Sequence, residues 1–147
     1  MKLANPPAYL FDVNVVVALM MEDHTHYRLV TQWFNVSSDI RWAVCAFTET
    51  GFLRTVTAPW QGQISMTDAT KLLEKLKEHP GYRYLPITVD WHTLCSPLYR
   101  RLYGTKQVTD AFLLGLAVHA GFILVTLDKA LLHLAGEAYK SHVLVLS

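Results

Sequence analysis

The chain has little of what marks secreted, disulfide-rich or membrane-embedded proteins. It contains two cysteines, Cys45 and Cys95, which are too few for a disulfide framework, so we expect two buried thiols. The longest apolar run, Val15 to Met21, falls far short of the roughly 20 residues that a membrane helix requires. The first ten residues, MKLANPPAYL, lack the basic and apolar regions of a secretion signal. These absences favour a cytoplasmic protein without a membrane partner.

An excess of charge of one sign is also missing. Lysine and arginine number 13 and aspartate and glutamate 12, which gives a formal net charge of +1, whereas nucleic-acid-binding domains are often strongly basic. Composition therefore does not favour a nucleic-acid binder, and function has to be inferred from the positions of individual residues. The length of 147 residues and the hydrophobic fraction of 52% predict a single folded domain, 1–147, with a sizeable core.

Segments rich in β-forming residues alternate with helical patterns along the chain. The predicted strands are 9–13, 41–45, 84–87, 122–126 and 142–146. The predicted helices are 15–20, 25–34, 48–56, 67–78, 91–103, 109–119 and 129–134. Thr67 and Thr109 are expected to cap helices, and Gly121 to end one. The alternation is typical of an α/β fold with a mainly parallel sheet.

Four acidic residues stand where a parallel sheet places its active site, outside the carboxyl ends of the strands. Asp12 ends the first strand and Asp128 follows the strand 122–126, while Glu49 and Asp110 lie in the first turns of helices. A carboxylate in a first helical turn is ordinary by itself. An aspartate at the end of a buried strand is costly unless a partner or a cation compensates its charge. The four together predict a cluster that binds a hard ion such as Mg²⁺ and performs phosphoryl chemistry.

Four segments resemble, in the family order, the motifs of PIN-domain ribonucleases, and specifically those of VapC-type toxins from VapBC toxin–antitoxin pairs. The segments, which lie within about 10–131, are FDVNVVVALM, WAVCAFTETGFLR, VTDAFLLGLAVHAG and ILVTLDKAL. The resemblance implies a three-layer α/β/α sandwich with a central, mainly parallel sheet. It also implies Mg²⁺- or Mn²⁺-dependent cleavage of RNA, a VapB-like antitoxin that blocks the site, and a homodimer.

The same resemblance assigns roles to six residues of this chain. It implies that the metal ligands and catalytic acids are Asp12, Glu49, Asp110 and Asp128, and that Asn14 and Thr126 orient them. Position 13 departs from the motif, because many members carry Ser or Thr where this chain has Val13. The change removes a hydroxyl next to the ligands, which affects how they are oriented.

Several other polar residues near these motifs have two interpretations. Arg100, Arg101 and Lys106 precede Asp110 closely and either hold RNA phosphates beside the acids or form an ordinary solvated helix end. For His24 and His26 we expect capping and surface contacts rather than metal binding, because no third ligand stands nearby in the sequence.

Two other functions fit part of the pattern. A Mg²⁺-dependent phosphatase with Asp12 as covalent nucleophile also needs an aspartate at a strand end, but it would carry a second aspartate where this chain has Asn14. A non-catalytic PIN-fold binding module is disfavoured by the presence of all four acids. The favoured mechanism is hydrolysis of an RNA phosphodiester bond by metal-activated water, which leaves a 5′-phosphate.

Overall fold

The computed structural model describes residues 6–36, 39–61 and 64–147. The strands in these ranges are Ala8–Phe11 (β1), Arg41–Val44 (β2), Tyr82–Tyr84 (β3), Ile123–Thr126 (β4) and Val143–Val145 (β5). The α-helices are Val13–Met20 (α1), Tyr27–Val36 (α2), Ala46–Val56 (α3), Met66–Leu76 (α4), Trp91–Cys95 (α5), Gln107–Ala120 (α6) and Ala130–Tyr139 (α7). Short 3-10 helices lie at Pro59–Gln61 (η1), Tyr99–Arg101 (η2) and Lys140–His142 (η3). In the described ranges, no helix combines the length and apolar character needed to span a membrane.

The strands form one parallel sheet in the order β3-β2-β1-β4-β5. The order reverses at β1, because the chain first adds β2 and β3 on one side and then returns to the other side with β4 and β5. Phe11 at the end of β1 lies opposite Val125 of β4. The ends of β1 and β4 therefore flank the switch point, which is where open parallel sheets bind their ligands.

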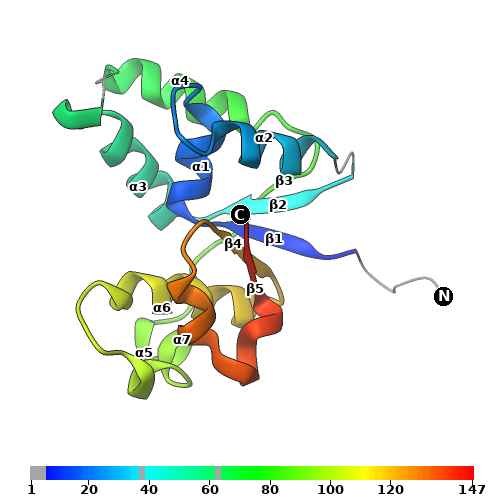
Figure 1. Cartoon of the computed structure of the whole chain (residues 1–147), viewed down its shortest axis with the longest axis vertical. Coiled ribbons are helices and arrows are strands. Elements are labelled where there is room, and N and C mark those ends of the chain that lie inside the picture. Colours follow the sequence, from blue (N-terminus) through cyan, green and yellow to red (C-terminus); the bar gives the residue numbers. More distant parts are fainter. Residues whose placement is uncertain (1–5, 37–38, 62–63) are drawn as a thin grey trace.

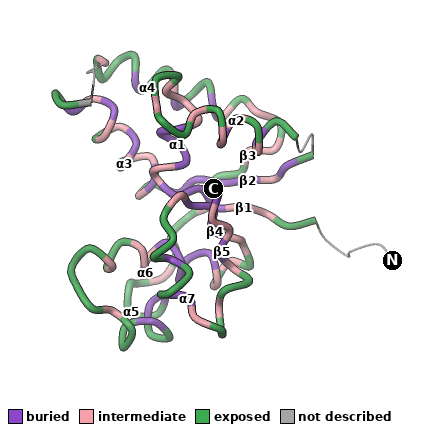
Figure 2. Tube along the Cα trace, in the orientation of Figure 1, coloured by how far each residue is buried: buried purple, intermediate pink, exposed green. Residues whose placement is uncertain are grey.

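Helices cover both faces of the sheet and enclose two separate cores. Figure 1 shows α1 to α4 on one face and α5 to α7 on the other. Phe11 and Trp42 pack into the core of the first face, whereas their neighbours Leu10 and Ala43 pack into the core of the second, as the two-residue period of a strand requires. Figure 2 shows the buried residues concentrated on the strands and the inner sides of the helices. This arrangement confirms the predicted three-layer α/β/α sandwich.

Helix ends follow local sequence signals, with small shifts from the predicted positions. The cap of α4 is Ser65 rather than Thr67, and its hydroxyl oxygen accepts the N–H of Asp68 at 3.0 Å. Helix α6 begins before the predicted cap Thr109, so that Asp110 lies in its first turn. Gly121 ends α6 as predicted, with a φ of 74°, a left-handed conformation that glycine adopts without steric cost.

The largest departure from the predicted elements lies between β3 and α6. The sequence predicts a helix over 91–103, but α5 ends at Cys95 and is followed by a turn and η2. Pro97 accounts for the break, because proline lacks an N–H and clashes with the preceding turn of a helix. Both cysteines, Cys45 and Cys95, are buried and unbridged as predicted.

The last helix is also longer than its prediction. The sequence predicts 129–134, whereas α7 continues to Tyr139 across a break at Gly136, which has a φ of 60°. The guanidinium of Arg101 donates to the carbonyl oxygens of His133 at 2.9 Å and Ala135 at 3.5 Å. A side chain on Gly136 would collide with this guanidinium. The glycine therefore lets the segment before α6 dock on α7.

Candidate active site

Asp12 lies at the junction of β1 and α1 and is only 7% exposed. Its Oδ1 accepts the N–H of Val13 at 2.7 Å, and its Oδ2 accepts the hydroxyl hydrogen of Thr126 at 2.7 Å. Its own N–H donates to the carbonyl of Val125 at 2.9 Å, which ties the end of β1 to β4. Burial raises the pKa of Asp12; the hydrogen bonds from Thr126 and Val13 oppose this, and the charge of Asp128 adds to it.

Thr126 and Asn14 fix the loop that follows β4. Thr126 is fully buried, and its Oγ1 accepts the N–H of Asp128 at 3.1 Å. The Oδ1 of Asn14 accepts the N–H of Leu127 at 3.3 Å. Asp128 in turn accepts the N–H of Ala130 at 2.9 Å, at the start of α7. The structure therefore places Asn14 and Thr126 in direct contact with the segment that carries Asp128, and Thr126 also in contact with Asp12.

Asp110 approaches Asp12 and Asp128 from α6, which lies on the other face of the sheet from α1. Together with Asp12, Asn14 and Asp128 it lines a pocket of about 290 Å³, which we call the acid pocket. The pKa of Asp110 is raised to about 6, first by burial and then by the negative charges of Asp12 and Asp128. Carboxylates that raise one another's pKa in this way form a negative pocket that attracts cations.

Glu49 does not line the acid pocket, although the sequence predicts it among the metal ligands. It lies in the first turn of α3, and its Oε2 forms an ion pair with Nζ of Lys77 at 2.8 Å. Lys77 also contacts Glu74, at 3.3 Å. The packing of α3 against α4 brings Lys77 to this position, directly after the end of α4.

The remaining donor set fits the requirements of Mg²⁺. Asp12, Asp110 and Asp128 offer hard carboxylate oxygens to the acid pocket. Across the described ranges, no three His, Cys, Asp or Glu side chains stand close enough to bind one ion by themselves. Mg²⁺ does not need such a cage, because it usually takes one or two carboxylates and completes its shell with water and phosphate oxygens.

His24 also lines the acid pocket, together with Val17 and Thr55. The expected capping contact exists, because Nδ1 of His24 accepts the backbone N–H of His26 at 3.0 Å. In addition to this predicted contact, the partly exposed His24 ring forms part of the wall of the acid pocket. No motif in the sequence indicates its position, because the loop after α1 must fold back along that helix before His24 meets the pocket.

The basic residues predicted to bind RNA are exposed and lie on the segment before Asp110. Arg101 is occupied by the carbonyl oxygens of α7. The guanidinium carbon of Arg100 lies 5.9 Å from the centre of the Tyr99 ring. Lys106 immediately precedes α6. Contact between RNA and Arg100, Arg101 or Lys106 stays a prediction.

Comparison with known proteins identifies the family. Residues 9–137 match the family model of the PIN domain. The chain is similar to Ribonuclease VapC38 of Mycobacterium tuberculosis (strain ATCC 25618 / H37Rv), with 37% identity over 140 residues, 94% of this chain and 97% of that protein. It is 35% identical over 125 residues to Ribonuclease VapC44 of Mycobacterium tuberculosis (strain CDC 1551 / Oshkosh), covering 83% and 87% of the two chains.

A solved structure shows the same fold. The crystal structure of PAE2754 from Pyrobaculum aerophilum superposes with a TM-score of 0.57 at 22% identity, over 87% of this chain and 79% of that one. At this identity the likeness concerns the fold alone. The match of the family model over most of the chain, the similarity to VapC38 and the parallel sheet lead to one conclusion: this chain belongs to the PIN domain family.

Proposed function

We propose that this protein is a Mg²⁺-dependent endoribonuclease that acts as the toxin of a type II toxin–antitoxin pair. The observation that carries the proposal is the acid pocket, where Asp12, Asp110 and Asp128 lie together at the switch point of the sheet. The names of similar proteins, Ribonuclease VapC38 and Ribonuclease VapC44, support the activity. The resemblance to VapC-type toxins further supports a VapB-like antitoxin as partner, a homodimer and a cytoplasmic location.

The proposed cofactor is Mg²⁺, and Mn²⁺ suits the same oxygen ligands. Asp12, Asp110 and Asp128 would hold the ion, which when bound activates a water for attack and compensates the charge on the departing oxygen. The carboxylates also explain why a cation is needed for binding, because on their own they repel the phosphates of RNA. Glu49 is left out of this ligand set because its carboxylate is paired with Lys77.

The surrounding residues position the carboxylates rather than react. The hydroxyl of Thr126 donates to Asp12 and accepts the N–H of Asp128. The side-chain oxygen of Asn14 accepts the N–H of Leu127, which precedes Asp128. Such supporting hydrogen bonds fix the orientation of metal ligands and tune their basicity. In this proposal, hydrolysis of the RNA phosphodiester bond leaves a 5′-phosphate.

The geometry counts against a phosphatase in which Asp12 is the covalent nucleophile. A phosphatase of this kind needs an acid close to its nucleophile, to protonate the departing group. The position that would supply this acid is Asn14, whose Oδ1 accepts a backbone N–H instead.

The test is incubation of structured RNA with the protein and Mg²⁺, followed by analysis of the fragment ends. We expect fragments with 5′-phosphates, no cleavage in EDTA, and loss of cleavage in Asp12→Asn and Asp110→Asn. Asp68→Asn, which changes an exposed acid in the first turn of α4, is the matched control and should cleave normally. Release of phosphate from small phosphomonoesters with RNA left intact would contradict the proposal and favour the phosphatase.

A further inference from the structure

A second pocket adjoins the acid pocket and has no part in the proposed chemistry. Its volume is about 240 Å³. Val17, His24 and Thr55 line both pockets, so the two lie side by side. The other residues that line the second pocket are Met21, Asp23, Thr25 and Val56. A polynucleotide whose phosphate lies at the carboxylates therefore has a neighbouring space into which an adjacent part of the chain can extend.

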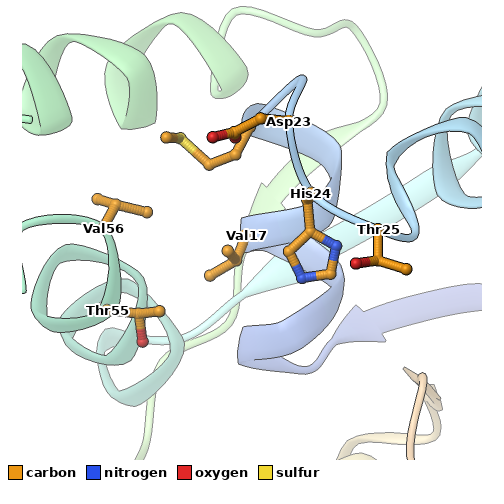
Figure 3. Close-up of a pocket in the computed structure, with 7 residues that line it drawn as sticks. Val17, Asp23, His24, Thr25, Thr55 and Val56 are labelled. Carbon is orange, nitrogen blue, oxygen red and sulfur yellow. The ribbon is translucent and has the colours of Figure 1, made fainter. Parts of the chain in front are cut away.

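The His24 ring is held in one orientation at the junction of the two pockets. Its Nδ1 accepts the backbone N–H of His26, so the neutral imidazole carries its proton on Nε2. Figure 3 shows the ring extending from the loop after α1 toward Val17, with Thr55 across the pocket on α3. The Nε2–H group is therefore a donor placed to contact whatever occupies the second pocket.

The polar groups of the second pocket suit the edge of a nucleobase. Asp23 offers acceptors only, His24 offers a donor, and the hydroxyls of Thr25 and Thr55 offer both. Val17 supplies apolar surface beside them. A phosphate suits the pocket poorly, because the carboxylate of Asp23 would repel it. Single-stranded RNA is commonly recognised by bases that are turned out of the strand and hydrogen-bonded at their edges.

We infer that the second pocket is a base-recognition subsite, here called the base pocket, an inference that rests on the proposed ribonuclease function. It takes the base next to the cleaved phosphate and selects a base that carries an exocyclic amino group. Asp23 accepts hydrogen bonds from that amino group, and Nε2–H of His24 donates to an acceptor on the same base. Uracil has no amino group, and its single edge donor, N3–H, lies between two carbonyl oxygens that the carboxylate would repel. Asp23 and His24 thus determine specificity, whereas the acid pocket performs the cleavage.

The test is cleavage of an RNA pool with randomised positions around the cut, read by sequencing the 5′-phosphate ends. At one flanking position the wild-type protein should prefer adenine, cytosine or guanine over uracil by roughly 5- to 100-fold, the range expected for hydrogen-bonded base contacts. Asp23→Asn should lose this preference, because an amide also donates to the carbonyl oxygens of uracil. An unchanged preference in Asp23→Asn would overturn the assignment of that residue.

Two substitutions of His24 separate base contact from loop structure. Asn places an oxygen near the position of Nδ1 and keeps the hydrogen bond to the N–H of His26, but it has no group at Nε2. Gln places an amide donor near Nε2. We expect His24→Asn to lose the base preference and His24→Gln to keep most of it. His26→Ala is the matched control, because the exposed His26 ring does not line the base pocket and only its backbone N–H is used.

Binding without cleavage distinguishes failure of this inference from failure of the proposed function. In the Asp110→Asn background, fluorescence anisotropy should show tighter binding of oligoadenylate and oligocytidylate than of oligouridylate, and His24→Asn should abolish the difference. If this binding preference is observed but the wild-type protein does not cleave RNA, the proposed ribonuclease function is wrong and the base pocket stands. Cleavage without base preference, or with a preference that His24→Asn leaves intact, would overturn the base pocket alone. Absence of both cleavage and preferential binding would overturn both.

Discussion

Thr126 donates its hydroxyl hydrogen to Oδ2 of Asp12 across 2.7 Å and thereby joins the ends of β4 and β1. The same hydroxyl oxygen accepts the N–H of Asp128 at 3.1 Å. One buried side chain thus positions two of the three carboxylates in the acid pocket. The spacing of these carboxylates is set by the sheet itself, through the register of β1 and β4.

Replacing Thr126 with valine tests this role, because the change keeps the shape and removes only the hydroxyl. The buried carboxylate of Asp12 loses a donor, so we expect the free energy of unfolding to fall by about 1–3 kcal/mol. The lost hydrogen bond normally lowers the pKa of Asp12, so the acid limb of the pH–activity profile should move to higher pH. Urea denaturation and cleavage rates across pH measure the two effects. Thr126→Ser keeps the hydroxyl and is the control; equal behaviour of the two variants would exclude the proposed role.

Asp110 should lower the stability of the metal-free fold at neutral pH. Its pKa of about 6 in the folded chain lies above its ordinary value of 3.8. The folded state therefore holds the proton more tightly than the unfolded state, and stability is lost as pH rises from about 4 to about 6. In EDTA at neutral pH, Asp110→Asn should be more stable than the wild type by roughly 1–2 kcal/mol, after allowance for solvent screening of a half-buried group.

The advantage of Asp110→Asn should shrink toward pH 4, where the wild-type carboxyl takes up its proton. Urea denaturation in EDTA at neutral and at acidic pH measures this change. A variant that is less stable than the wild type at neutral pH would show that the Asp110 carboxylate stabilises the first turn of α6. The repulsion within the acid pocket would then be the smaller effect.

Mg²⁺ or Mn²⁺ should raise the melting temperature of the wild-type protein. A ligand that binds only the folded state stabilises it by mass action, by about 2.7 kcal/mol at a hundredfold excess over the dissociation constant. Differential scanning fluorimetry with and without metal measures the shift. It should be largely absent in Asp12→Asn and Asp110→Asn and present in Asp68→Asn. An equal shift in all four proteins would place the bound metal outside the acid pocket.

Glu49 is a metal ligand according to the motif resemblance, but in the structure it lies outside the acid pocket. Because its carboxylate is paired with Lys77, we expect Glu49→Gln to slow RNA cleavage by less than about tenfold, a change of at most about 1.4 kcal/mol in the barrier. Asp12→Asn should be far more damaging in the same assay. Lys77→Met is the matched control and should lose about 1 kcal/mol of stability with the ion pair. If Glu49→Gln is as damaging as Asp12→Asn, then Glu49 leaves Lys77 and joins the metal in the working enzyme.

The fold and the positions of Asp12 and Asp128 could be predicted from the sequence for a physical reason. Strands buried on both sides are recognisable by composition, and a polar residue such as Asp12 or Asp128 directly after one marks its carboxyl end. Parallel strands bring their carboxyl ends to one edge of the sheet, so these positions converge whatever the loop details. Asn14 and Thr126 each stand two positions from one of these aspartates, and their supporting roles were implied by the resemblance to VapC-type toxins rather than by the strand pattern.

The contacts that the sequence did not predict depend on packing between segments that are far apart in the chain. The partner of Glu49 is decided by how α4 lies on α3, and the local helical pattern around Lys77 does not contain that information. His24 reaches the acid pocket only because its loop folds back along α1. Arg101 follows the turn after Pro97 and binds carbonyl oxygens of α7, more than thirty residues later in the chain. Each of these contacts is a property of the assembled layers.

The acid pocket is built from both layers of the sandwich. Asp110 is carried by α6 and the core beneath the sheet, whereas His24 and Thr55 are carried by the elements above it, as Figure 1 allows the reader to trace. The adjacent strands β1 and β4 lie between the two sides at this point. Tightly packed cores transmit small changes of volume as shifts of whole elements. Replacing a buried leucine of α6, such as Leu113, with alanine would therefore shift α6. The distance from Asp110 to His24 and Thr55 would change, and with it the rate of cleavage, although no polar residue is replaced.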